Sequence, residues 1–394
     1  MSAFASKYLD RLLKATSRSF YLTLRVLPRA IRPQIGLAYL LARTTDTIAD
    51  TEILPVAQRL DALKQLRGKI LGQNSAPLNF GELAQSQGSA AEKLLLEKTG
   101  ASLALLDKLS PEDLKRVREV LVTITSGQEL DLRRFSLGTT SALTPALSPG
   151  ERENVKNVVV NRTLSDSSQR GNGKLPLLGE RVGVRADLPA KIIALKTNVE
   201  LDDYTYRVAG CVGGFWTKMC RAHLFPQAKM DDVQFLTDGI RFGKGLQLVN
   251  ILRDLPADLK NGRCYLPLEK LSAAGLTPEN LLLPANEKKF LTLFDEYLDQ
   301  AEGHLAAGWR YTNTLPFGQF RLRLACAWPV LLGLRTRTKL RAAGVADLQA
   351  RVKVSRGEVR QIIFLSLLAC PLPFAWRKLY SPGGKAVASG GDLA

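Results

Sequence analysis

Hydrophobic residues recur with the 3.6-residue period of an α-helix along nearly the whole chain, whereas the alternating pattern of β-strands is scarce. This pattern predicts an all-α fold. One helix start is marked by Ser110 followed by Pro111, an N-cap residue before a proline at the first helical position. The predicted helices span residues of about 5–26, 31–50, 55–71, 88–106, 111–135, 191–222, 230–255, 287–312, 318–343 and 355–370.

The helical periodicity is interrupted between residues 136 and 189, where Ser, Thr, Gly, Pro, Asn and Arg predominate. A structureless loop of this length is uncommon inside a compact domain unless it is an insertion or a linker. The tripeptide Gly-Glu-Arg at 150–152 recurs at 179–181, and both surroundings resemble translated bacterial intergenic repeats. We therefore interpret 136–189 as a disordered, low-complexity insertion within a single domain spanning 1–394. A linker between two self-sufficient domains is the alternative.

The net charge of +18 predicts affinity for anions such as anionic lipid, nucleic acid or polyanionic small molecules. The basic residues are scattered through helical patterns and form no Lys/Arg-rich arm, so no nucleic-acid partner is expected. The longest apolar run, Ile362–Trp376, is too short to span a membrane comfortably and contains two prolines. We interpret it as a buried helix, with interfacial membrane contact as the alternative.

The first twenty residues carry charges throughout and lack the apolar segment of a signal peptide. We expect a cytoplasmic protein, with peripheral attachment to the inner face of the membrane as the alternative. The five cysteines show no CxxC spacing and are expected to be buried thiols. With only two histidines, His223 and His304, a His-based zinc site or a Ser-His-Asp triad is not supported.

Two short segments carry the candidate chemistry. Asp46 and Asp50 are four residues apart, as are Asp254 and Asp258, and each pair lies near an arginine in an apolar helical pattern. Residues four apart share one helix face, so each segment offers a paired-carboxylate edge. Mg²⁺ is commonly held by one or two carboxylates together with a substrate's phosphates. A single pair is usually a solvated face, whereas two such pairs favour a site that grips a diphosphate through metal.

Six segments of the chain match the pattern of a known family: Ser17–Phe20, Tyr39–Asp50, Tyr204–Gly213 and Gln247–Asp258, with Asn261–Pro267 and Lys353–Arg356. They make the chain resemble the squalene/phytoene synthase family of head-to-head prenyl transferases. The resemblance covers nearly the whole chain apart from the insertion. It implies an isoprenoid-synthase-like helical bundle around a central cavity.

The resemblance also implies roles for individual residues. Tyr204 would help to remove a proton and steer a carbocation, although a packing tyrosine is the alternative. An intrahelical salt bridge is the alternative for Arg43 and Arg253. The implied metal ligands are Asp46, Asp50, Asn250, Asp254 and Asp258, and the implied substrate-binding residues are Ser17, Arg18, Phe20, Tyr39, Arg43, Gln247, Asn250, Arg253 and Arg263.

The chain departs from the family pattern at three positions. Ala49 and Ala257 stand where relatives often have a further acid, so each edge has two carboxylates. Pro256 is expected to bend or end its helix and to re-aim Asp258.

Thr45 and Thr47 flank Asp46, whereas phytoene-type relatives usually have an acid directly beside this aspartate. The resemblance to the squalene synthase branch implies Mg²⁺-dependent condensation of two farnesyl diphosphates to presqualene diphosphate. It also implies conversion to squalene with NADPH, a cofactor that rests on the resemblance alone. Phytoene or dehydrosqualene synthesis is the alternative within the family. A basic membrane-surface binding protein without catalysis, or an all-α structural protein with an inactive site, is the alternative of another class.

Overall fold

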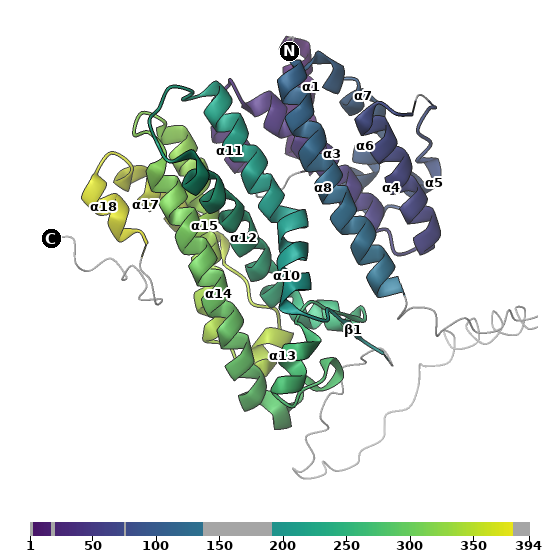
Figure 1. Cartoon of the computed structure of the whole chain (residues 1–394), viewed down its shortest axis with the longest axis vertical. Helices are drawn as coiled ribbons and strands as arrows, with labels where there is room; N and C mark the ends of the chain where they lie inside the picture. The colour runs from purple at the N-terminus through teal and green to yellow at the C-terminus, as the bar shows by residue number, and fades with distance from the viewer. Residues whose placement is uncertain (1–2, 17–19, 75, 137–190, 381–394) are drawn as a thin grey trace, which may run out of the picture.

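The computed structural model describes residues 3–16, 20–74, 76–136 and 191–380 (Figure 1). The fold is all-α, as predicted. Among the described residues the only strands are β1 (Ile193–Ala194) and β2 (Arg263–Cys264), which pair in parallel. Apart from Ser136, the predicted insertion at 136–189 lies outside the described residues.

The helices before the insertion differ from the prediction at the start of the chain. Residues 5–26, which were expected to form one long helix, are divided between α1 and α2. In the longest of them, the Ser110 hydroxyl accepts a hydrogen bond of 3.2 Å from the Asp113 backbone, which confirms the predicted N-cap. The elements are α1 (Ala3–Thr16), α2 (Phe20–Val26), α3 (Arg32–Ala49), α4 (Val56–Leu71), α5 (Gly81–Gln85), α6 (Ala90–Glu97), α7 (Thr99–Leu103), η1 (Leu106–Lys108) and α8 (Pro111–Phe135).

The second half of the chain is organised around α12, which packs against α10, η3, α11, α14 and α15 (Figure 1). On the other side, α8 packs against α3 and α4 and also contacts η3 and α11. The elements are α10 (Asn198–Thr205), the π-helical η3 (Tyr206–Gly210), α11 (Cys211–His223), α12 (Asp232–Lys260), α13 (Leu268–Ala273), η4 (Pro278–Asn280), η5 (Pro284–Asn286), α14 (Glu287–Thr314), α15 (Phe320–Arg341), α16 (Val345–Gln349), α17 (Arg356–Ala369) and α18 (Pro373–Lys378).

Two expectations about these helices were wrong. Pro256 does not end its helix, because α12 continues through it to Lys260 and keeps Asp258 in helical register. Pro256 is itself buried, and Leu255 and Leu259 beside it are almost fully buried. We infer that this burial offsets the cost of about 3 kcal/mol for a proline inside a helix. The single helix expected at 191–222 is instead β1, α10, η3 and α11 in succession.

Close approach between backbones fixes η3 and α11 against α12. A Cβ added at Gly213 would lie 1.9 Å from the carbonyl oxygen of Gly239. One added at Gly243 would lie 2.2 Å from the carbonyl oxygen of Ala209. Only glycine fits at these contacts, and they hold the chain segment that follows Tyr204 against the helix that carries Asp254.

The apolar run Ile362–Trp376 forms the end of α17 and most of α18. Ser366, Ala369 and Trp376 are buried, but large apolar side chains on the opposite face are exposed, so the prediction of a buried helix was wrong for that face. None of the described helices has the length and apolar content needed to cross a bilayer. The five cysteines are buried free thiols, as expected.

Candidate functional site

The first aspartate pair lies at the C-terminal end of α3. The Asp46 side chain is 45% exposed, yet surrounding protein raises its pKa to about 6, and the nearby charge of Asp50 adds to the effect. Gln128 from α8 donates a hydrogen bond to Asp46 Oδ1 through its Nε2. Burial also raises the pKa of Asp50, which is opposed by Arg43. The pair is therefore open to solvent but poorly hydrated, and a bound cation would stabilise its ionised form.

The second aspartate pair lies near the end of α12. Arg253 donates to Asp254 from Nε at 3.0 Å and from Nη2 at 2.5 Å. Burial raises the pKa of Asp258 to about 7, and the negative charges of Asp254, Asp131 and Asp50 act in the same direction. Asp258 is the carboxyl group of this pair that most lacks compensating positive charge.

The fold brings the two pairs into one electrostatic neighbourhood. The charge of Asp50 on α3 contributes to the raised pKa of Asp258 on α12. Arg263 on β2 acts on both, because its positive charge lowers the pKa of Asp50 and of Asp258 against the effect of burial. Two segments about two hundred positions apart in the chain thus meet around one guanidinium.

Tyr204 is the first member of a buried polar chain. Its ring stacks on that of Tyr265, with centroids 4.7 Å apart, and the two side chains share a hydrogen bond. The Tyr265 hydroxyl donates to Asp131 Oδ2 on α8 at 2.6 Å. Burial, with the nearby charge of Asp131, raises the pKa of Tyr204 well above its usual value, so the phenol stays protonated near neutral pH.

Asp131, Tyr265 and Gln128 were not identified from the sequence as site residues. Burial raises the pKa of Asp131 to about 6, and no described group hydrogen-bonds to its buried Oδ1. Gln128 and Asp131 are three residues apart on one face of α8, which was a sequence signal of the same kind as the aspartate pairs. Tyr265 lies within Asn261–Pro267, a segment that carried the family resemblance, but its own role was not inferred.

Three of the four arginines expected to bind substrate lie within the described residues, and each already contacts a carboxylate. Arg43 donates to Glu92 on α6 at 2.8 Å and lies 3.9 Å from Asp46. Arg253 pairs with its neighbour Asp254, as the salt-bridge alternative proposed, and Arg263 pairs with Glu52 at 2.9 Å. A diphosphate would have to replace these carboxylates as the partner of each guanidinium.

The remaining predicted residues lie in less defined surroundings. Tyr39 is half-buried one turn before Arg43, and Arg43 and Asp46 both influence its pKa, which burial raises. Gln247 and Asn250 are half-buried on α12, on the face that carries Asp254. Ser17 and Arg18 lie outside the described residues, and Phe20 begins α2 with a side chain that the structure does not describe.

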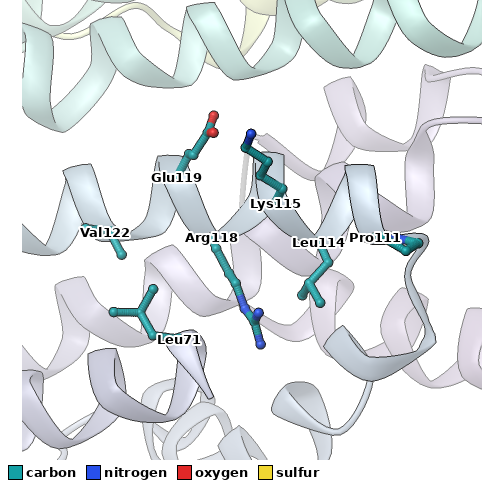
Figure 2. Close-up of a pocket in the computed structure, with 7 residues that line it drawn as sticks. All are labelled: Leu71, Pro111, Leu114, Lys115, Arg118, Glu119 and Val122. Atoms are coloured by element: carbon teal, nitrogen blue, oxygen red, sulfur yellow. The ribbon is translucent and has the colours of Figure 1, made fainter. Parts of the chain in front are cut away.

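A pocket of about 530 Å³ on α8 does not belong to this site (Figure 2). Figure 2 shows Arg118 pointing from α8 to the side on which Leu71 and Leu114 lie, and its Nε donates to the Ile70 carbonyl at 2.8 Å. Lys115 and Glu119 point the other way, and Glu119 pairs with Lys218 at 3.4 Å. Arg118 and Glu119 are therefore engaged in local contacts, and neither contacts the aspartate pairs.

Residues 13–145 and 154–358 match the family model described as squalene/phytoene synthase. The chain belongs to the squalene/phytoene synthase family. Solved structures agree in fold: a complex of TcSQS with the ligand E5700 matches at a TM-score of 0.68 and 17% identity, covering 95% of this chain and 90% of that one. The squalene synthase HpnC from Alicyclobacillus acidocaldarius matches at a TM-score of 0.52 and 16% identity, covering 86% and 93%.

Curated relatives in this prenyl transferase family include both branches. A phytoene synthase from Pseudescherichia vulneris is 30% identical over 159 residues, which are 39% of this chain and 47% of that protein. The chain thus spans about half the length of this relative. A squalene synthase from Schizosaccharomyces pombe is 24% identical over 365 residues, covering 91% of this chain and 64% of that protein.

The carboxylates fit the divalent metal that this prenyl transferase family typically needs. Among the described residues, no three His, Cys, Asp or Glu side chains form a ready-made cage for one ion. Mg²⁺ usually takes one or two carboxylates and completes its octahedron with water and phosphate oxygens. Burial raises the pKa of Asp46 and of Asp258, so these two carboxyl groups would gain most from such an ion.

Proposed function

We propose that this chain condenses two molecules of farnesyl diphosphate head to head into presqualene diphosphate and converts this product to squalene with NADPH. The supporting observation is the meeting of Asp50 and Asp258 around Arg263, with Asp46 and Asp258 near enough to the buried Tyr204 for their charges to raise its pKa. We further propose that the protein acts in the cytoplasm or at the inner face of the membrane.

The aspartates and Asn250 would hold Mg²⁺, whose charge assists departure of the diphosphate. Arg43, Arg253 and Arg263 would exchange their carboxylate partners for diphosphate oxygens, which a planar guanidinium can bind in pairs. The arginines would then stabilise the negative charge that develops on the diphosphate as it departs.

Tyr204 would act on the carbocation that departure of the diphosphate leaves behind. Its ring can stabilise positive charge, and its oxygen can accept the proton lost as the cyclopropane ring closes. Tyr265 would protonate Asp131 along the 2.6 Å hydrogen bond, and the Tyr204 hydroxyl would then turn to give its own proton to the Tyr265 oxygen. The carboxylate of Asp131 is the base at the end of this chain.

The choice of the squalene branch rests on the residues beside Asp46. Thr45 and Thr47 are both buried, and the Thr45 hydroxyl donates to the Ala42 carbonyl at 2.7 Å. These positions therefore add no carboxylate to the metal edge. The second candidate is phytoene synthase, favoured by the 30% identity to the Pseudescherichia vulneris enzyme.

Mass analysis of products separates the candidates. Purified protein with farnesyl diphosphate and Mg²⁺ should give squalene with NADPH, and presqualene diphosphate, alcohols or dehydrosqualene without it. Geranylgeranyl diphosphate should be a poor substrate, because a tunnel fitted to fifteen carbons must accommodate an extra isoprene unit. Efficient phytoene formation, unaffected by NADPH, would assign the chain to the other branch.

A non-catalytic membrane-surface protein is tested in the same assay. Asp254→Asn removes one carboxylate charge from the metal edge and should reduce turnover by orders of magnitude. The non-catalytic alternative requires instead that wild type gives no product with either diphosphate.

A further inference from the structure

Large apolar side chains form an exposed face on α17 and α18. Phe364, Leu367 and Leu368 follow the three- and four-residue spacing that places them on one side of α17. Leu372 and Phe374 continue the face into α18, and these five side chains are between 49% and 73% exposed. We call these five residues the α17–α18 face. It lies at the edge of the bundle where the two helices are labelled in Figure 1.

Buried contacts on the opposite side fix the outward orientation of this face. Trp328 on α15 donates to the Ser366 hydroxyl at 2.8 Å. Trp376 is 1% exposed, donates to Asn313 at 2.9 Å and stacks on Trp309 with centroids 5.4 Å apart. Because both helices are anchored from beneath, the exposed side chains cannot turn inward without breaking these contacts.

Positive charge borders the α17–α18 face at both ends. Residues 351–380 contain six basic residues and one acidic residue, Glu358. That carboxylate is held by Arg335 and Lys339 at 2.7 Å each, and despite burial these bonds lower its pKa to about 2. Arg360 lies one turn before Phe364, and Arg377 and Lys378 follow Phe374, so the charge facing solvent is positive.

We propose that the α17–α18 face docks on an anionic lipid bilayer. The apolar side chains would enter the boundary between headgroups and acyl chains while the basic residues contact lipid phosphates, as in interfacial helices. The Lys378 ammonium lies 4.4 Å from the centre of the Phe374 ring. A positive charge and an apolar side chain would therefore reach the same depth in the bilayer. A second copy of a chain with a charge of +18 would present the same basic border and be repelled.

Vesicle co-sedimentation tests the apolar half of the proposal. Wild type should bind vesicles of phosphatidylcholine with phosphatidylglycerol, and should bind pure phosphatidylcholine much more weakly. Phe364→Ser/Leu368→Ser should weaken binding about tenfold or more, because two large side chains no longer leave water. The matched control Val233→Ser/Leu283→Ser removes two exposed apolar side chains on other elements and should bind as wild type does. Turnover in detergent should stay at the wild-type level in both variants.

Neutralising basic side chains, in the same vesicle assay, tests the basic border. Arg377→Gln/Lys378→Gln should weaken binding to anionic vesicles about tenfold or more, since each basic residue near a charged bilayer contributes about fivefold. Lys288→Gln/Lys289→Gln, at the exposed start of α14, is the matched control and should change binding by less than about twofold.

Four results would overturn the proposal. The first is that wild type fails to bind anionic vesicles at low salt, and the second is that the α17–α18 variants bind as well as their controls do. A variant that converts a dimer to a monomer in light scattering, with vesicle binding unchanged, would assign the face to a second copy. A chain ending at Tyr380 that binds vesicles much more tightly than the full chain would mean that residues 381–394 cover the face.

Discussion

Removing the negative charge of Asp258 or Asp46 should make the folded protein more stable while it stops turnover. Burial holds both carboxyl groups at a raised pKa, so the folded state is penalised for keeping them ionised. Asn has nearly the same shape as Asp but carries no charge. Asp46→Asn also keeps the oxygen that accepts the hydrogen bond from Gln128.

The size of the effect follows from the pKa values. One unit of pKa corresponds to about 1.4 kcal/mol, so raising the pKa of Asp258 from 3.8 to about 7 represents at most about 4 kcal/mol at pH 8. Solvent screening and relaxation reduce this, and we expect about 2 kcal/mol for Asp258→Asn. For Asp46, whose side chain is 45% exposed, we expect about 1 kcal/mol. For a chain of this size, these energies correspond to increases in Tm of about 1 to 3 °C.

The predicted gain in stability should depend on pH. A carboxyl group whose pKa is higher in the folded state binds its proton more tightly there, so folding is favoured at low pH. For Asp258 this favourable contribution is complete below pH 3.8 and is lost as the pH rises through about 7. The extra stability of Asp258→Asn should therefore be largest at pH 8 and shrink to less than half at pH 5.

Thermal melts at pH 8 and pH 5 without metal, with turnover of farnesyl diphosphate measured in parallel, provide the test. Asp61→Asn is the control, since Asp61 is an exposed aspartate on α4 whose carboxylate accepts a hydrogen bond from Gln65 one turn along the same helix. It should change neither Tm nor turnover. If Asp258→Asn and Asp46→Asn melt at the wild-type temperature at pH 8, or if they keep normal turnover, the electrostatic account of the site is wrong.

Two further predictions concern the tyrosine chain and the insertion. Tyr265→Phe removes the hydroxyl that donates to Asp131 and contacts Tyr204, so it should lower kcat with little change in KM and cost about 1–3 kcal/mol of stability. Steady-state kinetics and thermal melts would measure both effects. An unchanged kcat would exclude the hydrogen-bonded Tyr204, Tyr265 and Asp131 from catalysis. Replacing Ser141–Asp187 with a short Gly/Ser linker should preserve folding and turnover, because loop-closure entropy grows slowly with length. An insoluble or inactive protein would contradict the hypothesis that this segment is an insertion within a single domain.

The sequence predicted the helices well because their periodicity is a local signal. It missed the π-helical stretch at 206–210, since a shift of one residue in the hydrogen-bond pattern leaves no mark on composition. It also misjudged Ile362–Trp376, where an apolar run conceals two faces with different surroundings. Only packing against α15 decides which face of α17 is buried.

Residues of the candidate site were predicted where the same spacing of two aspartates occurs twice in the chain, and were missed where no such repeat exists. The two aspartate pairs could be found because each places two carboxylates on one helix face. Asp131 lies on α8 and Tyr265 directly follows β2, and no spacing in the sequence connects either of them to Tyr204. Such a chain of hydrogen bonds exists only after these elements pack together.

Opposite charges in the site favour joint binding of metal and diphosphate. A diphosphate alone would meet the repulsion of Asp46, Asp50 and Asp258, whereas Mg²⁺ alone would leave phosphate-type ligand positions to water. Arg253 already contacts Asp254, so a diphosphate bound by Arg253 must displace that contact, and the displaced carboxylate gains a new partner only if metal is present. Each ligand thereby removes the main obstacle to the other. By linkage, the factor by which Mg²⁺ raises the affinity for diphosphate equals the factor by which diphosphate raises the affinity for Mg²⁺.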